Sequence, residues 1–391
     1  MASLRLHLLL VSTALLSSCA NPSSEIWIGI RSDGNRGKGT RASPYDGSTT
    51  EKFDAILSRL WQNRVENITI NILPGTYSTV GNGGYIPGYQ DLLEGWRCHS
   101  GWHIRGAGKD QTRLILSKIY QSPFDGLFGG VIIATTDSSV SHVTVENLTL
   151  DCNHSKIGNK KSTEAGVALS GTHHTIRNVR VVNVAGLGYE AFPIAIGSNN
   201  LDSFNNLIEF CEIRDWHGGT GGSITISNNN NNQKPPITWT TGIVRNNSVS
   251  GTHIGYGGWG MKGVVFSNNT AQNCTYAVNI DSLNNSSVVF NKNQFLKCTS
   301  YGMVFANCHK FLLQNNTITL KPGAGPFLFL LENNSDFDVR SNTFKAPPGN
   351  SPSIAATRHP DTLRGQFIFS SNSCPPGSKI DLPPHLLSVT P

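Results

Sequence analysis

The stretch Gly263–Cys274, GVVFSNNTAQNC, holds three apolar residues, a polar pair that ends in Asn269, and then small polar residues. Related stretches follow it, SVVFNKNQFLKC from Ser287 and FLLQNNTITL from Phe311. When the copies are aligned on Asn269, asparagine recurs every 22 to 30 residues, at Asn247, Asn269, Asn293, Asn316, Asn342 and Asn372. Three earlier stretches fit the same frame with Leu148, Val179 and Cys211 at that position. A period in the twenties indicates a solenoid.

The short alternation within each copy selects the kind of solenoid. Leucines do not occupy fixed positions, and the long amphipathic segments of helical repeats are absent. Residues such as Phe266 and Asn268 instead alternate with Val265 and Ser267, as in β-strands. The pattern therefore predicts an all-β fold, a parallel β-helix whose asparagines stack and bond to the coils above and below.

A short helix is expected before the first coil. In DGSTTEKFDAILSRL, Ser48 is a candidate N-cap and Glu51 follows three residues later. Phe53, Ile56, Leu57 and Leu60 then follow at helical spacing. Such a helix would cover the open end of the solenoid, which otherwise exposes core and strand edges.

The capping helix, ILPGTY, GWHIRGAG and the Asn-rich coils together resemble the pectin-lyase-like superfamily of right-handed parallel β-helices, from about Ile26 to about Cys374. The resemblance implies that fold and favours a carbohydrate ligand. It supplies no catalytic residue, because the motifs of polygalacturonases and the acidic calcium cluster of pectate lyases are absent.

Composition narrows the function classes. Only 14% of residues are charged, the net charge is +6, and no Lys/Arg block stands out. Nucleic-acid binders normally carry a basic stripe, so that class is not favoured. A mild attraction for an acidic polymer is compatible with this charge. The eight cysteines show no metal-type spacing, so neither a metal nor a cofactor is predicted.

The N-terminus reads as an export signal, with Arg5 before a short apolar run. LSSC, ending at Cys19, resembles a bacterial lipoprotein box, which would make Cys19 a lipidated residue; cleavage near Ala20 by an ordinary signal peptidase is the alternative. The expected organisation is a signal over 1–18, a linker over 19–25, one β-helix domain over 26–385 and a tail over 386–391. The protein is thus expected to be secreted or lipid-anchored, with the lipid as its one membrane contact, and its oligomeric state stays open.

A β-helix offers a groove along one sheet, so the strands with outward-facing polar residues are the place to look for chemistry. The predicted inward residues are Val167, Leu169, Ile194, Ile196, Ile224, Ile226, Val278, Ile280, Met303 and Phe305. The outward residues are mostly small, as a groove floor requires, and Asn279 and Asp281 are the polar exceptions.

Acidic, histidine and aromatic residues gather in the loops that lead into these strands. The predicted catalytic residues are Glu190, Asp215, His217, His253 and Asp281. The predicted substrate-binding residues are Trp216, Tyr256, Trp259, Lys262 and Asn279. Carboxyls one or two coils apart would bracket the spacings of glycosidases, histidine could act as acid or base, and aromatic rings could stack on sugars. The structural alternative is surface pairing of Glu190 and Asp215 with Arg180 or Arg214.

A second loop, DCNHSKIGNKKSTE, holds Asp151, His154, Lys160, Lys161 and Glu164. Its lysines could contact uronate carboxylates, but a solvated loop is the favoured interpretation. The leading functional hypothesis is hydrolysis of an extracellular polysaccharide by a carboxyl pair. A polysaccharide lyase, or a non-catalytic β-helix that binds glycan at the cell surface, is the alternative.

Overall fold

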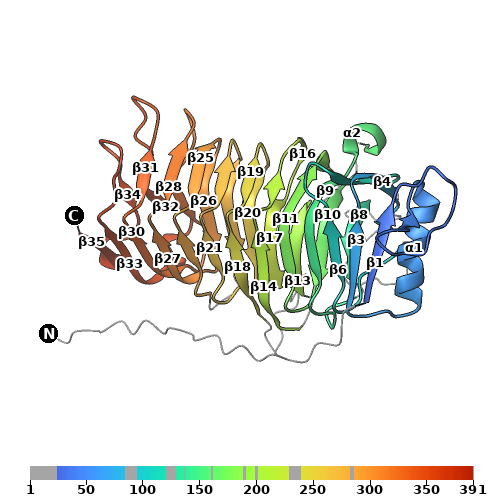
Figure 1. The fold of residues 1–391 in the computed structure, drawn as a ribbon. Helices are drawn as coiled ribbons and strands as arrows, with labels where there is room; N and C mark the ends of the chain where they lie inside the picture. The colour runs from blue at the N-terminus through green and yellow to red at the C-terminus, as the bar shows by residue number, and fades with distance from the viewer. Residues whose placement is uncertain are drawn as a thin grey trace.

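The computed structural model describes residues 24–83, 95–119, 129–135, 137–159, 162–187, 191–198, 201–228, 239–281 and 286–390. Over these ranges the chain winds into coils that stack along one axis, with α1 (Thr50–Gln62) at one end and the C-terminal strands at the other (Figure 1). The strands of successive coils pair in parallel, and β5 with β8 is an antiparallel exception. The predicted parallel β-helix and its capping helix are confirmed.

One face of the solenoid is an eleven-stranded sheet within the described residues. In spatial order its strands are β5 (Asn82–Gly83), β8 (Gly130–Ala134), β10 (Glu164–Ser170), β13 (Ile194–Ser198), β17 (Gly222–Asn228), β20 (Ile254–Trp259), β23 (Tyr276–Asp281), β26 (Tyr301–Ala306), β29 (Leu328–Leu330), β32 (Ala355–Thr357) and β34 (Ile380–Asp381).

The other strands form a 22-stranded sheet in the same described ranges, apart from a small pair. The large sheet contains β1 (Ser24–Gly29), β2 (Tyr45–Asp46), β3 (Ile68–Ile72), β4 (Gly75–Thr79), β6 (His103–Gly106), β7 (Thr112–Leu116), β9 (Thr144–Asp151), β11 (Thr175–Val182), β14 (Ser203–Glu209), β15 (Glu212–Ile213), β18 (Thr240–Arg245), β19 (Ser248–Ser250), β21 (Val265–Ser267), β22 (Thr270–Gln272), β24 (Val289–Asn291), β25 (Gln294–Cys298), β27 (His309–Gln314), β28 (Thr317–Leu320), β30 (Ser335–Arg340), β31 (Thr343–Lys345), β33 (Arg364–Ser370) and β35 (Leu387–Thr390). The pair is β12 (Val184–Gly186) with β16 (Trp216–Gly219).

The repeated asparagines form a buried ladder at the corner between two strands of each coil. The Oδ1 atom of Asn293 accepts hydrogen bonds from the backbone N–H and the Nδ2 of Asn269, both at 3.0 Å. Asn293 in turn donates to Asn316, and its Nδ2 also donates to the carbonyl of Phe266. The same pattern runs from Asn247 to Asn372. The predicted structural role of these asparagines is confirmed.

A stack of phenylalanine rings fills the core beside the ladder. Phe266, Phe290, Phe311, Phe337 and Phe367 come from successive coils, and their ring centroids lie 4.7, 6.2, 5.2 and 5.5 Å apart. All five are buried. Burying one such side chain contributes about 1.5–3 kcal/mol, so each coil adds a similar increment of stability.

The capping helix begins one residue later than predicted. Thr49, rather than Ser48, is the N-cap, and its hydroxyl accepts from the backbone N–H of Lys52. Ser48 instead donates its backbone N–H to Asp46, which holds the preceding turn. Phe53 and Leu57 are buried and cover the first coils.

The chain ends differ slightly from the expected domain bounds. The strands run from Ser24 in β1 to Thr390 in β35, which pairs with β33 inside the stretch expected to be a tail. Among the residues that the structure describes, no helix is long and apolar enough to cross a membrane. No disulfide joins the cysteines in that part of the chain, and six of them are buried: Cys98, Cys152, Cys211, Cys274, Cys298 and Cys308. Burial raises the pKa of Cys211 and of Cys298 to about 12.

Replacing the ladder residue Asn293 with alanine should destabilise the protein by about 3 kcal/mol, because the carbonyl of Phe266, the amide of Asn269 and Oδ1 of Asn316 lose buried partners. Urea unfolding followed by circular dichroism measures this. Asn291→Ala is the matched control: Asn291 lies two residues away, is partly exposed and makes one long 3.3 Å side-chain bond, so its loss should cost under about 1 kcal/mol. Equal effects would contradict the ladder's role.

Candidate functional site

The outer face of the eleven-stranded sheet has a floor of small residues. All ten predicted inward residues are buried, which confirms the predicted alternation. On the outer face the register aligns Ala168, Ala195, Thr225, Gly257 and Asn279 in one row across β10, β13, β17, β20 and β23. These side chains are short, so the row forms a low floor, in which Thr225 is nearly fully buried.

Five partly exposed aromatic side chains rise from this floor, and we call them the aromatic strip: Phe192, Trp259, Tyr276, Tyr301 and Phe329. Tyr276 stacks on Tyr301 at 5.7 Å between ring centroids, and Tyr301 stacks on Phe329 at 4.6 Å. Phe192 and Trp259 meet edge to face at 5.3 Å. Phe192 lies two residues before β13 and Trp259 ends β20, so these two side chains approach each other across β17, the strand between β13 and β20. Of the strip, sequence reasoning found Trp259 alone.

Asp281 and Asn279 lie on the face where they were predicted. Asn279 is partly exposed between Gly257 and Val304 in the row of small residues. Asp281 is exposed and is aligned with Trp259. Its Oδ1 accepts from Nδ2 of Asn307 at 2.8 Å, so the carboxylate also holds a turn in place.

Asp215 lies far from Asp281. Asp215 sits in the turn before β16, exposed, with Arg214 Nε 4.0 Å from its carboxylate. Asp281 is the last residue of β23, so it lies at the C-terminal ends of the strands of the eleven-stranded sheet, whereas Asp215 precedes β17. Asp281 also lies two coils further along the solenoid. Five residues of strand span roughly 16 Å and two coils about 10 Å, so these two carboxyls exceed the 5–9.5 Å of a glycosidase pair.

The structure contradicts one predicted contact with substrate. Tyr256 is fully buried, and its hydroxyl lies 3.0 Å from the carbonyl oxygens of Asn247 and Thr270. It aligns with the inward residues Ile224 and Val278, because Gly255 and Tyr256 both face the core and interrupt the alternation. Tyr256 therefore braces the ladder corner from within and cannot touch a ligand on the sheet.

The remaining predicted residues differ in exposure and in the groups that they contact. Trp216 is partly buried against the core. Lys262 is exposed beyond the far end of β20, with its ammonium 5.9 Å from the ring centroid of Trp239. His253 precedes β20 and meets the Tyr276 ring edge to face at 5.1 Å. Glu190 and Cys19 lie outside the described residues.

The sequence placed His154 and Glu164 in a loop whose favoured interpretation was a solvated one, and for Glu164 that interpretation is wrong, because this residue is buried in a cluster with His154. Glu164, the first residue of β10, is fully buried. Its two carboxylate oxygens lie 3.1 and 3.2 Å from Nδ1 of His154, and Oε2 also accepts a hydrogen bond from the backbone N–H of Ala185 at 2.9 Å. The His154 ring lies 5.3 Å from the ring of His217, which is exposed. The predicted residue His217 thus belongs to a group with His154 and Glu164, which we call the His–Glu cluster.

Local sequence explains how the His–Glu cluster forms. Asn153, in a left-handed conformation, starts the single helical turn α2 (His154–Ile157), and this turn carries His154 back over the sheet edge. Phe192 of the aromatic strip packs against a small apolar cluster of Val131, Ala134 and Ala165. Ala165 directly follows Glu164 in β10, so the strip and the buried carboxylate share this strand. A glutamate at the start of an apolar strand, ten residues after a histidine, was the available signal.

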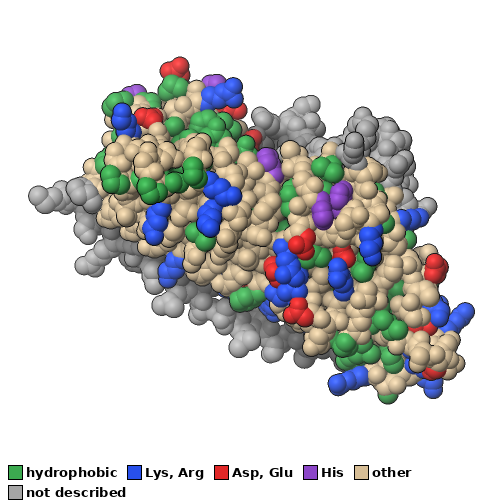
Figure 2. Space-filling model, turned by 90° about the horizontal axis from the view of Figure 1, so that it is seen from above, with side chains coloured by type: hydrophobic (Ala, Val, Ile, Leu, Met, Phe, Trp, Pro, Cys, Tyr) green, Lys and Arg blue, Asp and Glu red, His purple; other side chains and the backbone are tan. Residues whose placement is uncertain are grey.

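Salt bridges lie in and next to β15, the strand that precedes β16 and His217. Arg180 pairs with Glu212 at 2.6 Å and with Asp110 at 2.5 Å, and Arg214 lies 3.5 Å from Glu212. Figure 2, which looks down on the side from which α2 projects, shows histidine side chains beside a group of acidic and basic side chains. Within the described part of the chain, no three His, Cys, Asp or Glu side chains are arranged to hold a metal ion.

Comparisons with known proteins agree with this fold. A family model described as "right handed beta helix region" matches residues 165–360. The tailspike protein of Escherichia coli bacteriophage HK620, in complex with a pentasaccharide, aligns over 87% of this chain and 61% of its own, at 12% identity and a TM-score of 0.57. A variant of that tailspike, also with pentasaccharide, aligns over 88% and 63%, at 12% identity and a TM-score of 0.59.

A third structure is the A-module of an Azotobacter vinelandii mannuronan C-5 epimerase, which aligns over 93% of this chain and all of its own at 13% identity. Its TM-score of 0.47 is too low to support an argument. The chain spans about three fifths of the tailspike's length, and at these identities the likeness indicates the fold alone. No curated protein matches the chain in sequence.

Burial lowers the pKa of His253, so we expect a neutral imidazole in the folded protein at neutral pH. A histidine whose folded pKa is depressed contributes stability that is complete above the unfolded pKa, about 6.5, and that declines as the pH falls below it. His253→Phe keeps the ring contact with Tyr276 and removes the titration. Urea midpoints at pH 7.5 and 5.5 should therefore fall less in His253→Phe than in the wild type. An equal or larger fall in the variant would contradict the pKa assignment.

Proposed function

The chain belongs to the family of right-handed β-helix proteins, and from this premise we propose that it is a carbohydrate-active protein that holds a polysaccharide along the outer face of its eleven-stranded sheet. The aromatic strip carries this proposal. Aromatic rings offer large, rigid apolar faces, and sugars present C–H faces that stack on them. Five such side chains along a floor of small residues suit an extended polymer better than a compact ligand.

Two further observations support a polysaccharide. The tailspike protein with the same fold is described in complex with a pentasaccharide. The net charge of +6 favours an acidic polymer over a neutral one.

We also propose that the protein is exported through the signal-like residues 1–18, either as a secreted protein or as one anchored by a lipid on Cys19. Fractionation of producing cells tests it.

We propose that the polymer is cleaved beside the His–Glu cluster. His154 is the acid or base, since Glu164 fixes its Nδ1 and leaves Nε2 for substrate, and a histidine oriented by a carboxylate is a common acid–base device. Glu164 is a positioning residue and His217 lines the approach. Hydrolysis by Asp215 with Asp281 is not favoured, because the register separates them. Elimination and hydrolysis assisted by His154 both fit, and their products differ.

Trp259→Ala and Tyr301→Ala should each weaken polysaccharide binding about tenfold, because each removes a stacking surface worth roughly 1–1.5 kcal/mol. Binding is measured on acidic and neutral polysaccharides by titration calorimetry. Phe204→Ala is the control, since Phe204 is also an exposed aromatic side chain but lies on β14 of the other sheet. The proposal fails if the strip variants bind as well as Phe204→Ala, or if no polysaccharide binds the wild type.

Glu164→Gln should lower kcat for depolymerisation by 10²–10⁴-fold with little change in KM, because the amide keeps the contact with Ala185 but no longer orients His154 by charge. New reducing ends and the absorbance of unsaturated uronate products are read together, so hydrolysis and elimination are distinguished. A KM and a urea unfolding midpoint close to those of the wild type would show that the loss lies in the chemical step, because a purely structural role would change them together with kcat.

Glu209→Gln provides the control for that experiment. Glu209 is also a buried carboxylate, but its partners are Arg177 and Arg245 on the other sheet, so activity per folded molecule should stay at the wild-type level. Full activity in Glu164→Gln would remove the cluster from the mechanism. Binding without cleavage of any polymer by the wild type would indicate a non-catalytic glycan-binding protein.

A further inference from the structure

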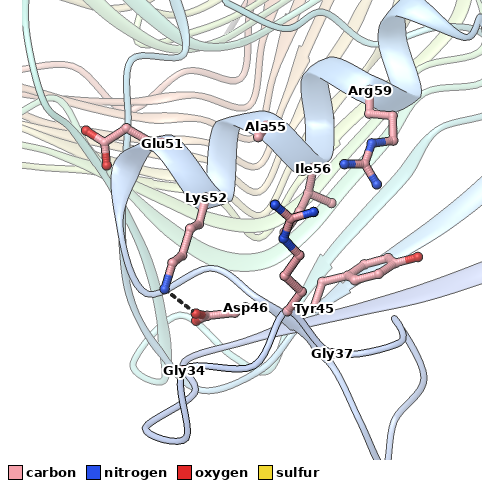
Figure 3. Close-up of a pocket in the computed structure, with 10 residues that line it drawn as sticks. Gly34, Gly37, Tyr45, Asp46, Glu51, Lys52, Ala55, Ile56 and Arg59 are labelled. Atoms are coloured by element: carbon pink, nitrogen blue, oxygen red, sulfur yellow. Dashed lines mark hydrogen bonds and ion pairs between the residues drawn. The ribbon is translucent and has the colours of Figure 1, made fainter.

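A cavity of about 400 Å³ lies under the outer side of the capping helix, far along the solenoid from most of the aromatic strip. Its walls are α1 and the loop that runs from Gly34 to Tyr45 (Figure 3). Because α1 turns Phe53 and Leu57 into the solenoid, the opposite face, with Lys52, Ile56 and Arg59 at helical spacing, is left to line the cavity.

Some of the charged side chains that line this cavity form ion pairs with each other, and others do not. Lys52 is neutralised by Asp46, whose carboxylate lies 2.6 Å from Nζ. Burial raises the pKa of Asp46, but hydrogen bonds from Lys52 and Ser48 outweigh it and lower the pKa to about 2, so this carboxylate stays charged and engaged. Glu51 also lines the cavity, at the Lys52 end and away from Arg59 in Figure 3. Hydrogen bonds from its own backbone N–H and from Thr49 lower the pKa of its carboxyl, which forms no ion pair with Arg36 or Arg59.

Two arginines remain without an acidic partner. Arg59 extends from α1 into the cavity in Figure 3, and Arg36 lines it from the loop side. Neither guanidinium forms an ion pair with any residue in the described part of the chain. Two guanidinium groups that face one recess repel each other, and an oxyanion between them would accept paired N–H bonds from each.

The rest of the lining indicates what the anion is attached to. Ile56 is partly buried and, with the Tyr45 ring, provides an apolar wall. The cavity volume is in the range of sites for small organic ligands and exceeds what a bare phosphate fills. The two arginines come from different segments, the loop and the helix, so a bound anion would link the cap to the first coils.

We propose that this cavity binds a small organic oxyanion, a carboxylate or phosphate carried on a ring-sized body, with the oxyanion between Arg36 and Arg59 and the body against Ile56 and Tyr45. The site is independent of the proposed polysaccharide face, and either can fail alone. Binding to the folded state should raise the midpoint of thermal unfolding, since a ligand stabilises the state that it binds.

The test is titration calorimetry and thermal unfolding of the whole protein with galacturonate, glucose 6-phosphate, inorganic phosphate and glucose as probes. We expect at least one organic oxyanion to bind with a Kd of about 1 mM or tighter, and glucose not to bind. Arg36→Gln with Arg59→Gln should weaken that binding at least tenfold. Lys345→Gln, which removes an exposed cation from β31, should leave it unchanged.

Ile56→Ala tests the contact with the organic body separately from the contact with the oxyanion. It should weaken binding of the organic oxyanion several-fold and leave binding of inorganic phosphate unaffected. The proposal is overturned if no oxyanion binds the wild type, or if the double arginine variant binds as well as Lys345→Gln. Inorganic phosphate that binds as tightly as glucose 6-phosphate would overturn the assignment of an organic ligand. None of these results depends on polysaccharide binding or cleavage.

Discussion

Buried amide-to-amide hydrogen bonding at one corner of each coil is the constraint on which the rest of the structure depends. An asparagine side chain in a core is costly unless its donors and acceptor are satisfied. From Asn269 onward each Oδ1 accepts two hydrogen bonds from the previous asparagine, and Nδ2 of Asn269 donates both to Asn293 and to the carbonyl of Val244. The ladder therefore fixes the register of each coil on its neighbour. The same register brings the phenylalanine rings of successive coils into contact.

The ladder constrains one corner, and the turns on either side of the eleven-stranded sheet can vary. The turn between β25 and β26 is short, whereas the stretch between β9 and β10 contains the helical turn α2 and leads to the buried carboxylate of Glu164 at the start of β10. The site of the proposed chemistry therefore lies where the periodicity stops. The outer face of the sheet combines both: its small floor follows the repeat, and its aromatic side chains do not.

The same division explains how much the sequence predicted. The fold, the ladder and the inward residues followed from period and alternation, because those patterns are local and repeated. Tyr256 was misplaced because Gly255 and Tyr256 both point inward, and a Gly-rich stretch gives no alternation from which to detect this. The cluster of His154 with Glu164 and His217 joins α2, β10 and β16, and no local pattern in the sequence specifies how these non-repeating segments meet. Phe192, Tyr276 and Tyr301 were hidden because one aromatic side chain per strand carries meaning only once the strands are aligned.

The direction of the ladder has a consequence for how such a protein can change in size. Every rung presents the same acceptor to the coil before it and the same donors to the coil after it, so the junction between any two rungs is equivalent. Duplicating the segment from Asn269 to Asn293 would reproduce both junctions and leave neighbouring coils bonded as before. Each duplication would lengthen the outer face by about 4.8 Å. Gain or loss of one repeat would therefore change the length of the outer face, and with it the length of the proposed polymer site, in steps of one coil.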